Sequence, residues 1–160
     1  MQELVPLAGR IAALLVTRKE TLTVAESSAG GLISASLLAV PGASTYFLGS
    51  AVVYTRQSRG LLLGISEADM AAIRPATEAY AFLLARTAQK KFSSSWALSE
   101  TGATGPTGNR YGDAPGHACF AVSGRREKAI TLETRSADRQ ANMRAFARGA
   151  LMLLLENLSE

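Results

Sequence analysis

Hydrophobic residues follow two spacings along this chain, and each spacing predicts a different kind of element. The apolar residues of positions 3–19 recur every three or four places, which predicts an amphipathic helix: Leu4, Leu7, Ala8, Ile11, Leu14 and Leu15. Residues 21–25 alternate instead and carry β-branched side chains, which predicts a short strand. Residues 32–38 return to the helical spacing, and Pro41 with Gly42 ends that helix.

Strands and helices are also predicted to alternate along the rest of the chain. Further strands are expected at residues 50–55, 96–99, 117–122 and 129–134. Further helices are expected at 67–73, from Pro75 to about Lys91, and at 137–157 with Asp138 near its start. Proline suits a first helical position because its missing N–H is not needed there.

The order of these elements, α-β-α-β-α-α-β-β-β-α, predicts an α/β fold with helices on both faces of one sheet. Strands separated by helices should lie parallel, whereas the strand pair at 117–134 has a short turn and should form an antiparallel edge. With 160 residues, 48% of them hydrophobic, the chain can bury a core as one domain over residues 1–160. The expected architecture is a three-layer α/β/α sandwich with a mostly parallel sheet and an antiparallel edge.

Charge and composition indicate which classes of molecule this protein is expected to bind. The net charge of +4 suits a small phosphate-bearing ligand, but the basic residues are scattered and few aromatic residues lie between them. A nucleic-acid partner is therefore not expected. No run of about 18 apolar residues occurs, so no membrane partner is expected either. The first residues lack the basic start and apolar run of a secretory signal, which favours the cytoplasm.

Two scarce residue types limit metal and disulfide chemistry. Cys119 is the only cysteine and His117 the only histidine. An intrachain disulfide and a cysteine-based metal cluster are therefore excluded. A zinc site would need an unusual supply of carboxylate ligands.

The final predicted helix leaves the oligomeric state open. Its apolar residues are too many for one narrow stripe: Leu151, Leu153, Leu154, Leu155 and Leu158. Such a helix either offers a surface for a homo-oligomer or packs deeply within one chain.

The first candidate for chemistry is the segment Glu26-Ser27-Ser28-Ala29-Gly30-Gly31, between a predicted strand end and a helix start. Free backbone N–H groups and the positive end of a helix dipole meet at such a junction, which suits a phosphate or a developing oxyanion. Ser27 or Ser28 would be positioned there to attack a carbonyl group. Taken alone, the segment favours the plainer interpretation that a serine caps the helix.

Two later segments can add polar groups to the same site. Tyr54 at a predicted strand end and Arg59 offer a hydroxyl and a cation, although a half-buried tyrosine and a solvated arginine are the simpler interpretation. Residues 101–108 form a Gly/Thr/Pro loop after the strand at 96–99, where open α/β sheets bind ligands; an ordinary mobile loop is the alternative. The spacing matches neither a P-loop nor Gly-x-Gly-x-x-Gly, so ATP and NAD are not expected by those routes.

Together these segments resemble the C-terminal domain of the CinA family. That family typically shows Glu-Ser-Cys-Thr-Gly-Gly, Gly-Ser-Ser, Tyr-Ser-Asn-x-x-Lys and Leu-Gly-Val, and later Val-Ser-Glu and Gly-Ile-Ala-Gly-Pro-x-Gly-Gly. The corresponding segments here are residues 26–31, 42–44, 54–59, 63–65, 76–78 and 102–108. No single motif is specific, but the ordered set covers essentially the whole chain.

The resemblance implies a stand-alone α/β/α domain that hydrolyses the carboxamide of nicotinamide mononucleotide to nicotinic acid mononucleotide and ammonia. It implies no metal and no organic cofactor. Ser27 would be the nucleophile, although the sequence does not separate it from Ser28, and Tyr54 and Arg59 would assist. The residues implied to bind the substrate or an oxyanion are Ser28, Gly30, Gly31, Ser44, Thr101, Gly102, Thr104 and Gly105.

Several departures from the family motifs fall on the implied chemistry. Arg59 stands where the family has lysine, and arginine cannot act as a base because its pKa exceeds about 12. Ser28 replaces the motif cysteine, Ala29 replaces the threonine, and residues 114–117 (Ala-Pro-Gly-His) replace Lys-Pro-x-Gly. His117 can in principle act as a base, but a lone histidine at a strand start is more often structural. The alternatives are therefore a diverged paralogue that binds a nucleotide without turnover, and a partner-binding role without a small ligand.

Overall fold

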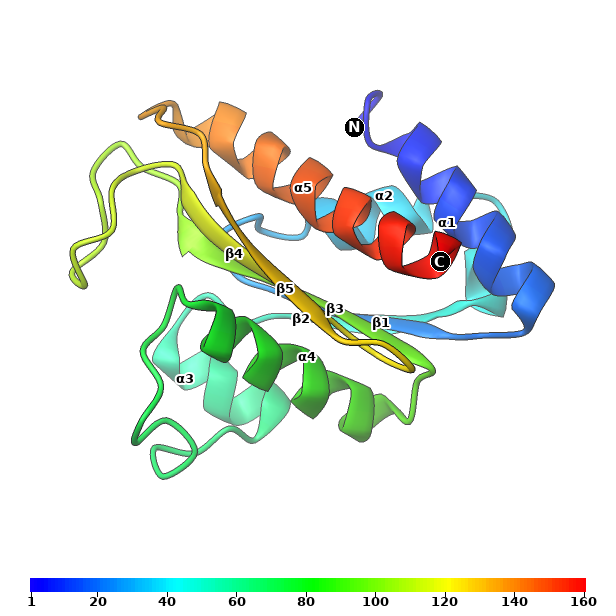
Figure 1. Cartoon of the computed structure of the whole chain (residues 1–160), viewed down its shortest axis with the longest axis horizontal. Helices are drawn as coiled ribbons and strands as arrows, with labels where there is room; N and C mark the ends of the chain where they lie inside the picture. Colours follow the sequence, from blue (N-terminus) through cyan, green and yellow to red (C-terminus); the bar gives the residue numbers. More distant parts are fainter.

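The computed structural model describes residues 1–160. The helices are α1 (Val5–Arg18), α2 (Leu32–Leu38), α3 (Arg56–Ser58), α4 (Glu78–Phe92) and α5 (Arg139–Ser159), with two short helical turns, η1 (Ala43–Thr45) and η2 (Arg59–Leu63). The strands are β1 (Leu22–Glu26), β2 (Phe47–Val52), β3 (Trp96–Ala103), β4 (His117–Ser123) and β5 (Lys128–Glu133). Strands and helices therefore alternate along the chain much as the hydrophobic pattern predicts (Figure 1).

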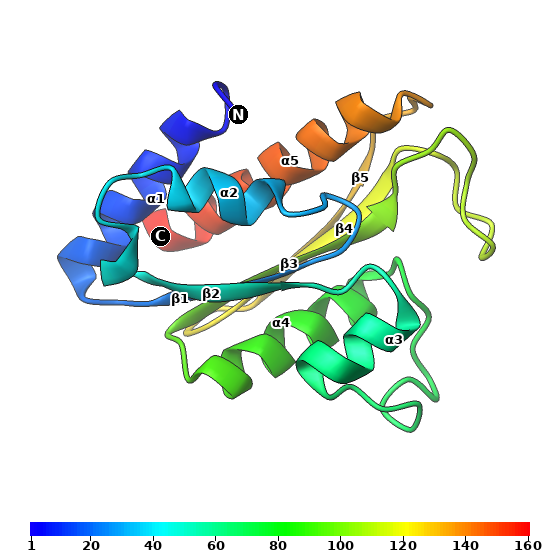
Figure 2. The same cartoon turned by 180° about the vertical axis from the view of Figure 1, so that it is seen from behind.

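One five-stranded sheet, in the order β2-β1-β3-β4-β5, forms the middle layer. β1 pairs in parallel with β2 and β3, whereas β4 pairs antiparallel with both β3 and β5. Figures 1 and 2 show α1, α2 and α5 on one face of the sheet and α3 and α4 on the other. The predicted α/β fold with helices on both faces and an antiparallel edge is therefore confirmed, as a mixed sheet.

The main core lies between the sheet and the layer of α1, α2 and α5. It joins apolar side chains from all three helices to Trp96 and Phe120 of the sheet. The five leucines of α5 that left the oligomeric state open are all buried in this core: Leu151, Leu153, Leu154, Leu155 and Leu158. They pack deeply within one chain and offer no free apolar stripe.

Helix starts follow local capping chemistry. The Thr77 side chain accepts a hydrogen bond from the Tyr80 N–H at 3.2 Å, so α4 begins at Glu78 and not at Pro75 as predicted. The Asp138 carboxylate accepts a bond from the Ala141 N–H at 3.0 Å, and it caps α5 as its position suggests.

Three further segments differ from the prediction. Residues 67–73 form successive turns with i→i+3 bonds and no helix. β2 begins and ends three residues early, because Thr55 caps α3 and leaves the sheet. β3 continues past Ser99 to Ala103, because its pairing with β4 extends that far.

The carboxyl ends of β1, β2 and β3 meet at one edge of the sheet, since the three strands are parallel. The segments that follow them, residues 27–31, 53–55 and 104–116, therefore come together there. None of the helices combines the length and the apolar character that crossing a membrane requires.

Candidate functional site

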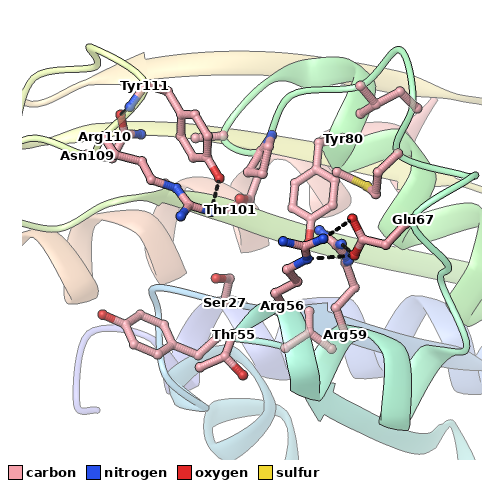
Figure 3. Close-up of a pocket in the computed structure, with 17 residues that line it drawn as sticks. Ser27, Thr55, Arg56, Arg59, Glu67, Tyr80, Thr101, Asn109, Arg110 and Tyr111 are labelled. Atoms are coloured by element: carbon pink, nitrogen blue, oxygen red, sulfur yellow. Dashed lines mark hydrogen bonds and ion pairs between the residues drawn. The ribbon is translucent and has the colours of Figure 1, made fainter.

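Two neighbouring cavities lie at this edge, and they share Tyr54, Gly102 and Asn109 as lining residues. The larger cavity has a volume of about 550 Å³ and is drawn in Figure 3; its other lining residues are Ser27, Val53, Thr55, Arg56, Arg59, Glu67, Met70, Ile73, Pro75, Ala76, Tyr80, Thr101, Arg110 and Tyr111. The smaller cavity has a volume of about 240 Å³, and its other lining residues are Ser28, Ala103, Thr104, Gly105, Thr107, Gly108 and Arg139. Because they share walls, the two cavities form one site with two compartments.

Most residues predicted for the site converge on these cavities. Ser27, Tyr54, Arg59, Thr101 and Gly102 line the larger cavity. The other predicted residues that reach the site line the smaller cavity: Ser28, Thr104 and Gly105. Segments from three parts of the chain thus meet at one place, which argues against a role without any small ligand.

The start of α2 is capped by a buried carboxylate from the preceding strand. Glu26 accepts hydrogen bonds from the backbone N–H groups of Gly31 (2.9 Å), Ile33 (3.2 Å) and Ser34 (3.0 Å). The Ser34 hydroxyl donates to the same carboxylate. The positive end of the helix is therefore occupied by Glu26 itself and is not left open for a ligand anion.

Three of the predicted binding residues lie outside both cavities. The Gly31 N–H is bound to Glu26, and the Gly30 N–H donates to the Ser27 carbonyl at 3.1 Å, so neither amide is free for an oxyanion. Both glycines have positive φ, +67° and +98°, which suits glycine, and they shape the turn. Ser44 is exposed on η1, which precedes β2 and so lies at the opposite end of that strand.

A second buried carboxylate, Glu100 of β3, holds the two-serine turn that precedes this helix start. One of its oxygens accepts the backbone N–H groups of Ser27 (2.9 Å) and Ala29 (2.8 Å). Its other oxygen accepts the hydroxyl of Ser28. Burial away from water raises the pKa of Glu100 to about 7, against the opposing effect of these three hydrogen bonds.

The two serines of the turn have different surroundings. The Ser28 side chain is 4% exposed, lines the smaller cavity and donates its hydroxyl proton to Glu100. The Ser27 hydroxyl lines the larger cavity and has no hydrogen-bond partner in the protein. Figure 3 shows Ser27 between the group of Arg56, Arg59 and Glu67 and the pair of Arg110 and Tyr111.

Arg59 is a buried cation rather than the solvated arginine of the simpler interpretation. The residue is 5% exposed, and its guanidinium donates to Glu67 at 3.0 Å and lies 6.0 Å from the ring centre of Tyr80. Its Nε is buried and has no hydrogen-bond partner. Arg56 donates to the same carboxylate, and this hydrogen bond lowers the pKa of Glu67. The group carries a net positive charge into the larger cavity.

Tyr54 lies at the boundary between the two cavities. Its hydroxyl accepts a hydrogen bond from the Arg139 guanidinium at 3.2 Å. Arg139 also donates to the carbonyl of Gly105 at 2.7 Å, which ties the start of α5 to the glycine-rich loop. A tyrosine hydroxyl beside a fixed cation is therefore available to both compartments.

The loop of residues 104–116 is held by an ion pair and offers free backbone donors. Asp113 accepts hydrogen bonds from Arg74 (2.6 Å) and from the Asn109 side chain (2.7 Å), and the Arg74 bond lowers its pKa. The amide N–H groups of Gly105 and Thr107 make no hydrogen bond within the protein. They are candidates to bind an oxyanion or a phosphate.

His117 does not reach either cavity and cannot be the base there. Its Nε2 donates to the carbonyl of Ala76 at 2.8 Å, and its Nδ1 contacts the carboxylate of Glu133. Burial opposes protonation, but these two hydrogen bonds together with the negative charges of Asp113 and Glu133 outweigh it, so the pKa of His117 is raised. The histidine supports the wall of the larger cavity through Ala76.

Several site residues are not among the predicted ones, and Glu100 is the most important of them. The others are Arg56, Glu67, Asn109, Arg110 and Arg139. A charged residue within a stretch of small and apolar residues, Trp96-Ala-Leu-Ser-Glu-Thr-Gly102, is the signal that could have identified Glu100. The predicted strand ended one residue before it.

The sequence of this chain is similar to those of CinA-family proteins. The model of the CinA C-terminal domain family matches residues 4–158. A CinA-like protein of Prochlorococcus marinus (strain MIT 9301) is 36% identical over 119 residues, which cover 74% of this chain and 28% of the relative. A CinA-like protein of Chloroherpeton thalassium (strain ATCC 35110 / GB-78) is 35% identical over 159 residues, which cover 96% of this chain and 38% of the relative. The chain thus spans well under half the length of these relatives.

Solved structures share the fold. A CinA superfamily protein from Klebsiella pneumoniae 700603 superposes with a TM-score of 0.90 at 24% identity, covering 98% of each chain. The competence damage-inducible protein A of Klebsiella pneumoniae subsp. pneumoniae MGH 78578 gives a TM-score of 0.91 at 23% identity with the same coverage. With the family match over nearly its whole length and the same arrangement of helices around the sheet, this chain belongs to the CinA C-terminal domain family.

Proposed function

We propose that this domain hydrolyses the carboxamide of nicotinamide mononucleotide, or of a close analogue, to the carboxylic acid and ammonia. The observation that carries the proposal is the convergence of two serines, Tyr54 and a buried arginine on one two-compartment site. The larger cavity, about 550 Å³, falls within the range of roughly 300–1,000 Å³ of small-molecule sites.

The charges of the larger cavity fit a phosphate-bearing ligand. Arg56, Arg59 and Arg110 line it together with a single carboxylate, Glu67. Guanidinium groups match the geometry and charge of phosphate oxygens. Arg59 is buried, so its positive charge is little screened by water and attracts a ligand anion in the cavity more strongly than a surface charge would. A small nucleotide is therefore the partner that we propose, with neither nucleic acid nor membrane involved.

The reaction would proceed through an acyl-enzyme. A serine hydroxyl of the turn would attack the amide carbon, ammonia would leave, and water would then release the carboxylic acid and restore the serine. Ser27 has an unbonded hydroxyl in the larger cavity, and Ser28 has a bonded hydroxyl in the smaller one. Tyr54 would assist proton transfer, and free N–H groups of the glycine-rich loop would bind the oxyanion.

Binding without hydrolysis is the second candidate, and Arg59 favours it. The guanidinium at the position of the family lysine is ion-paired with Glu67 and keeps its proton, so it cannot accept one from a serine. On this alternative the ligand stabilises the fold and is released unchanged.

Ammonia release from nicotinamide mononucleotide tests the proposal directly. We expect release by the wild type and by Ser44→Ala, an exposed serine outside both cavities, and loss of release when both Ser27 and Ser28 are replaced by alanine. A folded wild type that releases no ammonia would contradict the proposal. A rise in melting temperature with the nucleotide, without turnover, would support the second candidate, and rescue by Arg59→Lys would show that the base had been lost.

A further inference from the structure

Only one of the two serines in the turn faces a group that can accept its proton. The Ser28 hydroxyl donates to the carboxylate of Glu100, and Glu100 is fully buried. The Ser27 hydroxyl has neither a carboxylate nor a histidine as a hydrogen-bond partner, and the nearby Arg59 keeps its proton. A serine is a weak nucleophile unless an adjacent base takes its proton. The geometry therefore separates the two serines that the motif alone leaves equivalent.

We infer that Glu100 is the general base for Ser28, which makes Ser28 the nucleophile and the smaller cavity the reaction compartment. This inference rests on the proposed amide hydrolysis for its substrate, and it identifies the base that Arg59 does not provide. The larger cavity, with its arginines, then holds the phosphate-bearing part of the substrate, and the carboxamide reaches past Tyr54 toward Ser28.

The lining of the smaller cavity supplies the other groups that this chemistry needs. The free N–H groups of Gly105 and Thr107 can donate to the oxygen of a tetrahedral intermediate. The Tyr54 hydroxyl can donate a proton to the leaving nitrogen. Arg139 contacts that hydroxyl at 3.2 Å, and its positive charge offsets the charge of the phenolate that forms.

The protons balance over the two half-reactions. In the first, the Ser28 oxygen bonds to the amide carbon as its proton passes to Glu100, and the C–N bond breaks as Tyr54 protonates the leaving nitrogen to give ammonia. In the second, water attacks the ester carbon and gives its proton to the Tyr54 phenolate. The ester bond then breaks, and Glu100 returns its proton to Ser28. No further reactant is required.

The surroundings of Glu100 suit a base that works near neutral pH. Two backbone N–H groups hold one carboxylate oxygen in place, so the other stays aimed at the Ser28 hydroxyl. Glu26 of β1 is the charged neighbour that perturbs Glu100, and it acts in the same direction as burial, toward a pKa of about 7. A base whose pKa lies near the working pH combines ionisation with the ability to take a proton.

Glu100→Gln tests the base while preserving the shape of the site. The amide oxygen can still accept the two N–H groups, and the amide nitrogen can donate to the Ser28 oxygen, so the three contacts remain with one reversed. The matched control is Ser34→Ala, because Ser34 also donates its hydroxyl to a buried glutamate, Glu26, and lies outside both cavities. Circular dichroism and melting temperature establish that each variant is folded.

The first measurement is covalent labelling with a small fluorophosphonate, mapped to single residues by mass spectrometry. We expect labelling of Ser28 in the wild type and in Ser34→Ala, at a rate that rises with pH up to about 7. In Glu100→Gln the rate should fall by roughly 100-fold or more, the usual size of general-base catalysis, and lose this pH dependence. Labelling of Ser27 instead, no labelling of Ser28, or an unchanged rate in Glu100→Gln would each overturn the inference.

Ammonia release separates this inference from the proposed function. If nicotinamide mononucleotide is hydrolysed, release should survive in Ser34→Ala, which lines neither cavity, and be lost in Ser28→Ala and Glu100→Gln. Release that depends on Ser27 and not on Ser28 would overturn the inference and leave the proposed function standing. If the wild type releases no ammonia but Ser28 is labelled with the expected dependence on Glu100, the proposed substrate is wrong and the base assignment holds.

Discussion

Two buried glutamates accept hydrogen bonds from neighbouring parts of residues 27–34, Glu100 from the two-serine turn and Glu26 from the start of α2, and they differ in what they leave free. Both side chains are 0% exposed, and both accept a serine hydroxyl together with backbone N–H groups. Glu26 accepts three N–H groups at the start of α2, and its serine, Ser34, lines neither cavity of the site. Glu100 accepts two N–H groups, and its serine, Ser28, lines the smaller cavity.

The comparison teaches that burial alone does not decide the role of a carboxylate. Every donor on Glu26 belongs to one helix start, where the carboxylate satisfies N–H groups that would otherwise lack partners. The Ser28 hydroxyl on Glu100 can instead be exchanged for a substrate bond. We therefore assign Glu26 to the stability of the turn and Glu100 to its chemistry, and the predictions below test this division.

The largest expected effect is on stability, from Glu26→Ala. The substitution leaves the N–H groups of Gly31, Ile33 and Ser34 without partners in a buried place. Each such group costs roughly 1–3 kcal/mol, so we expect a loss of about 3 kcal/mol or more in the free energy of unfolding. Urea unfolding followed by circular dichroism measures it, with Glu3→Ala as the exposed control. A loss no larger than that of the control would show that α2 does not depend on this cap.

Glu100→Gln should act mainly on the pH dependence of stability. The folded pKa, about 7, lies above the ordinary value of 4.5, so between these values the folded state holds a proton that the unfolded state has lost. Stability therefore falls as pH rises from 4.5 to 7, by on the order of 3 kcal/mol.

The glutamine variant has no such proton and should lose this slope. Urea midpoints of the wild type and Glu100→Gln, measured at intervals from pH 4.5 to 8, give the comparison. Equal slopes in the two proteins would mean that Glu100 ionises as it does in the unfolded chain, and the contrast with Glu26 would then rest on geometry alone.

A smaller effect comes from removing the two serine hydroxyls. Ser28→Ala and Ser34→Ala each delete one hydrogen bond to a buried carboxylate, and each should cost about 1–2 kcal/mol of unfolding free energy. The two variants should thus be similar in stability and differ in ammonia release, which only Ser28→Ala should lose. If a folded Ser34→Ala variant also lost ammonia release, the assignment of Glu26 to stability and Glu100 to chemistry would be wrong.

The fold was largely predictable because its signals are local. The helical spacing over residues 32–38 matches α2, and the short turn between β4 and β5 made an antiparallel pair necessary. The helix predicted at residues 67–73 was wrong, because that segment forms only turns with i→i+3 hydrogen bonds.

The site was predictable only in part, because its chemistry depends on pairing between distant strands. The order of motifs identified Ser27, Tyr54 and Arg59, and all three line the larger cavity. Glu100 meets Ser28 across 72 positions of sequence, through the parallel register of β1 with β3, and no local pattern encodes that contact. Ser44 does not reach the cavities, because its motif precedes β2 whereas the cavities lie after the end of that strand.

The smallest expected effect is a second pH dependence, from His117. Its pKa is raised in the folded protein, so the protonated ring stabilises the fold fully below the unfolded pKa near 6.5. That stabilisation is lost as pH rises through the folded pKa, which is the same direction as for Glu100 but in a higher window. The effect should be smaller because the partner Glu133 is about half exposed and solvent screens the pair.

Measuring His117→Gln in the Glu100→Gln background isolates this effect. The glutamine amide can still donate to the carbonyl of Ala76, so the wall of the larger cavity keeps that contact. We expect the remaining fall in the urea midpoint above pH 6.5 to disappear in the double variant. A midpoint that is already flat from pH 6 to 8 in Glu100→Gln alone would assign the whole pH dependence to Glu100, because the only histidine would then contribute nothing.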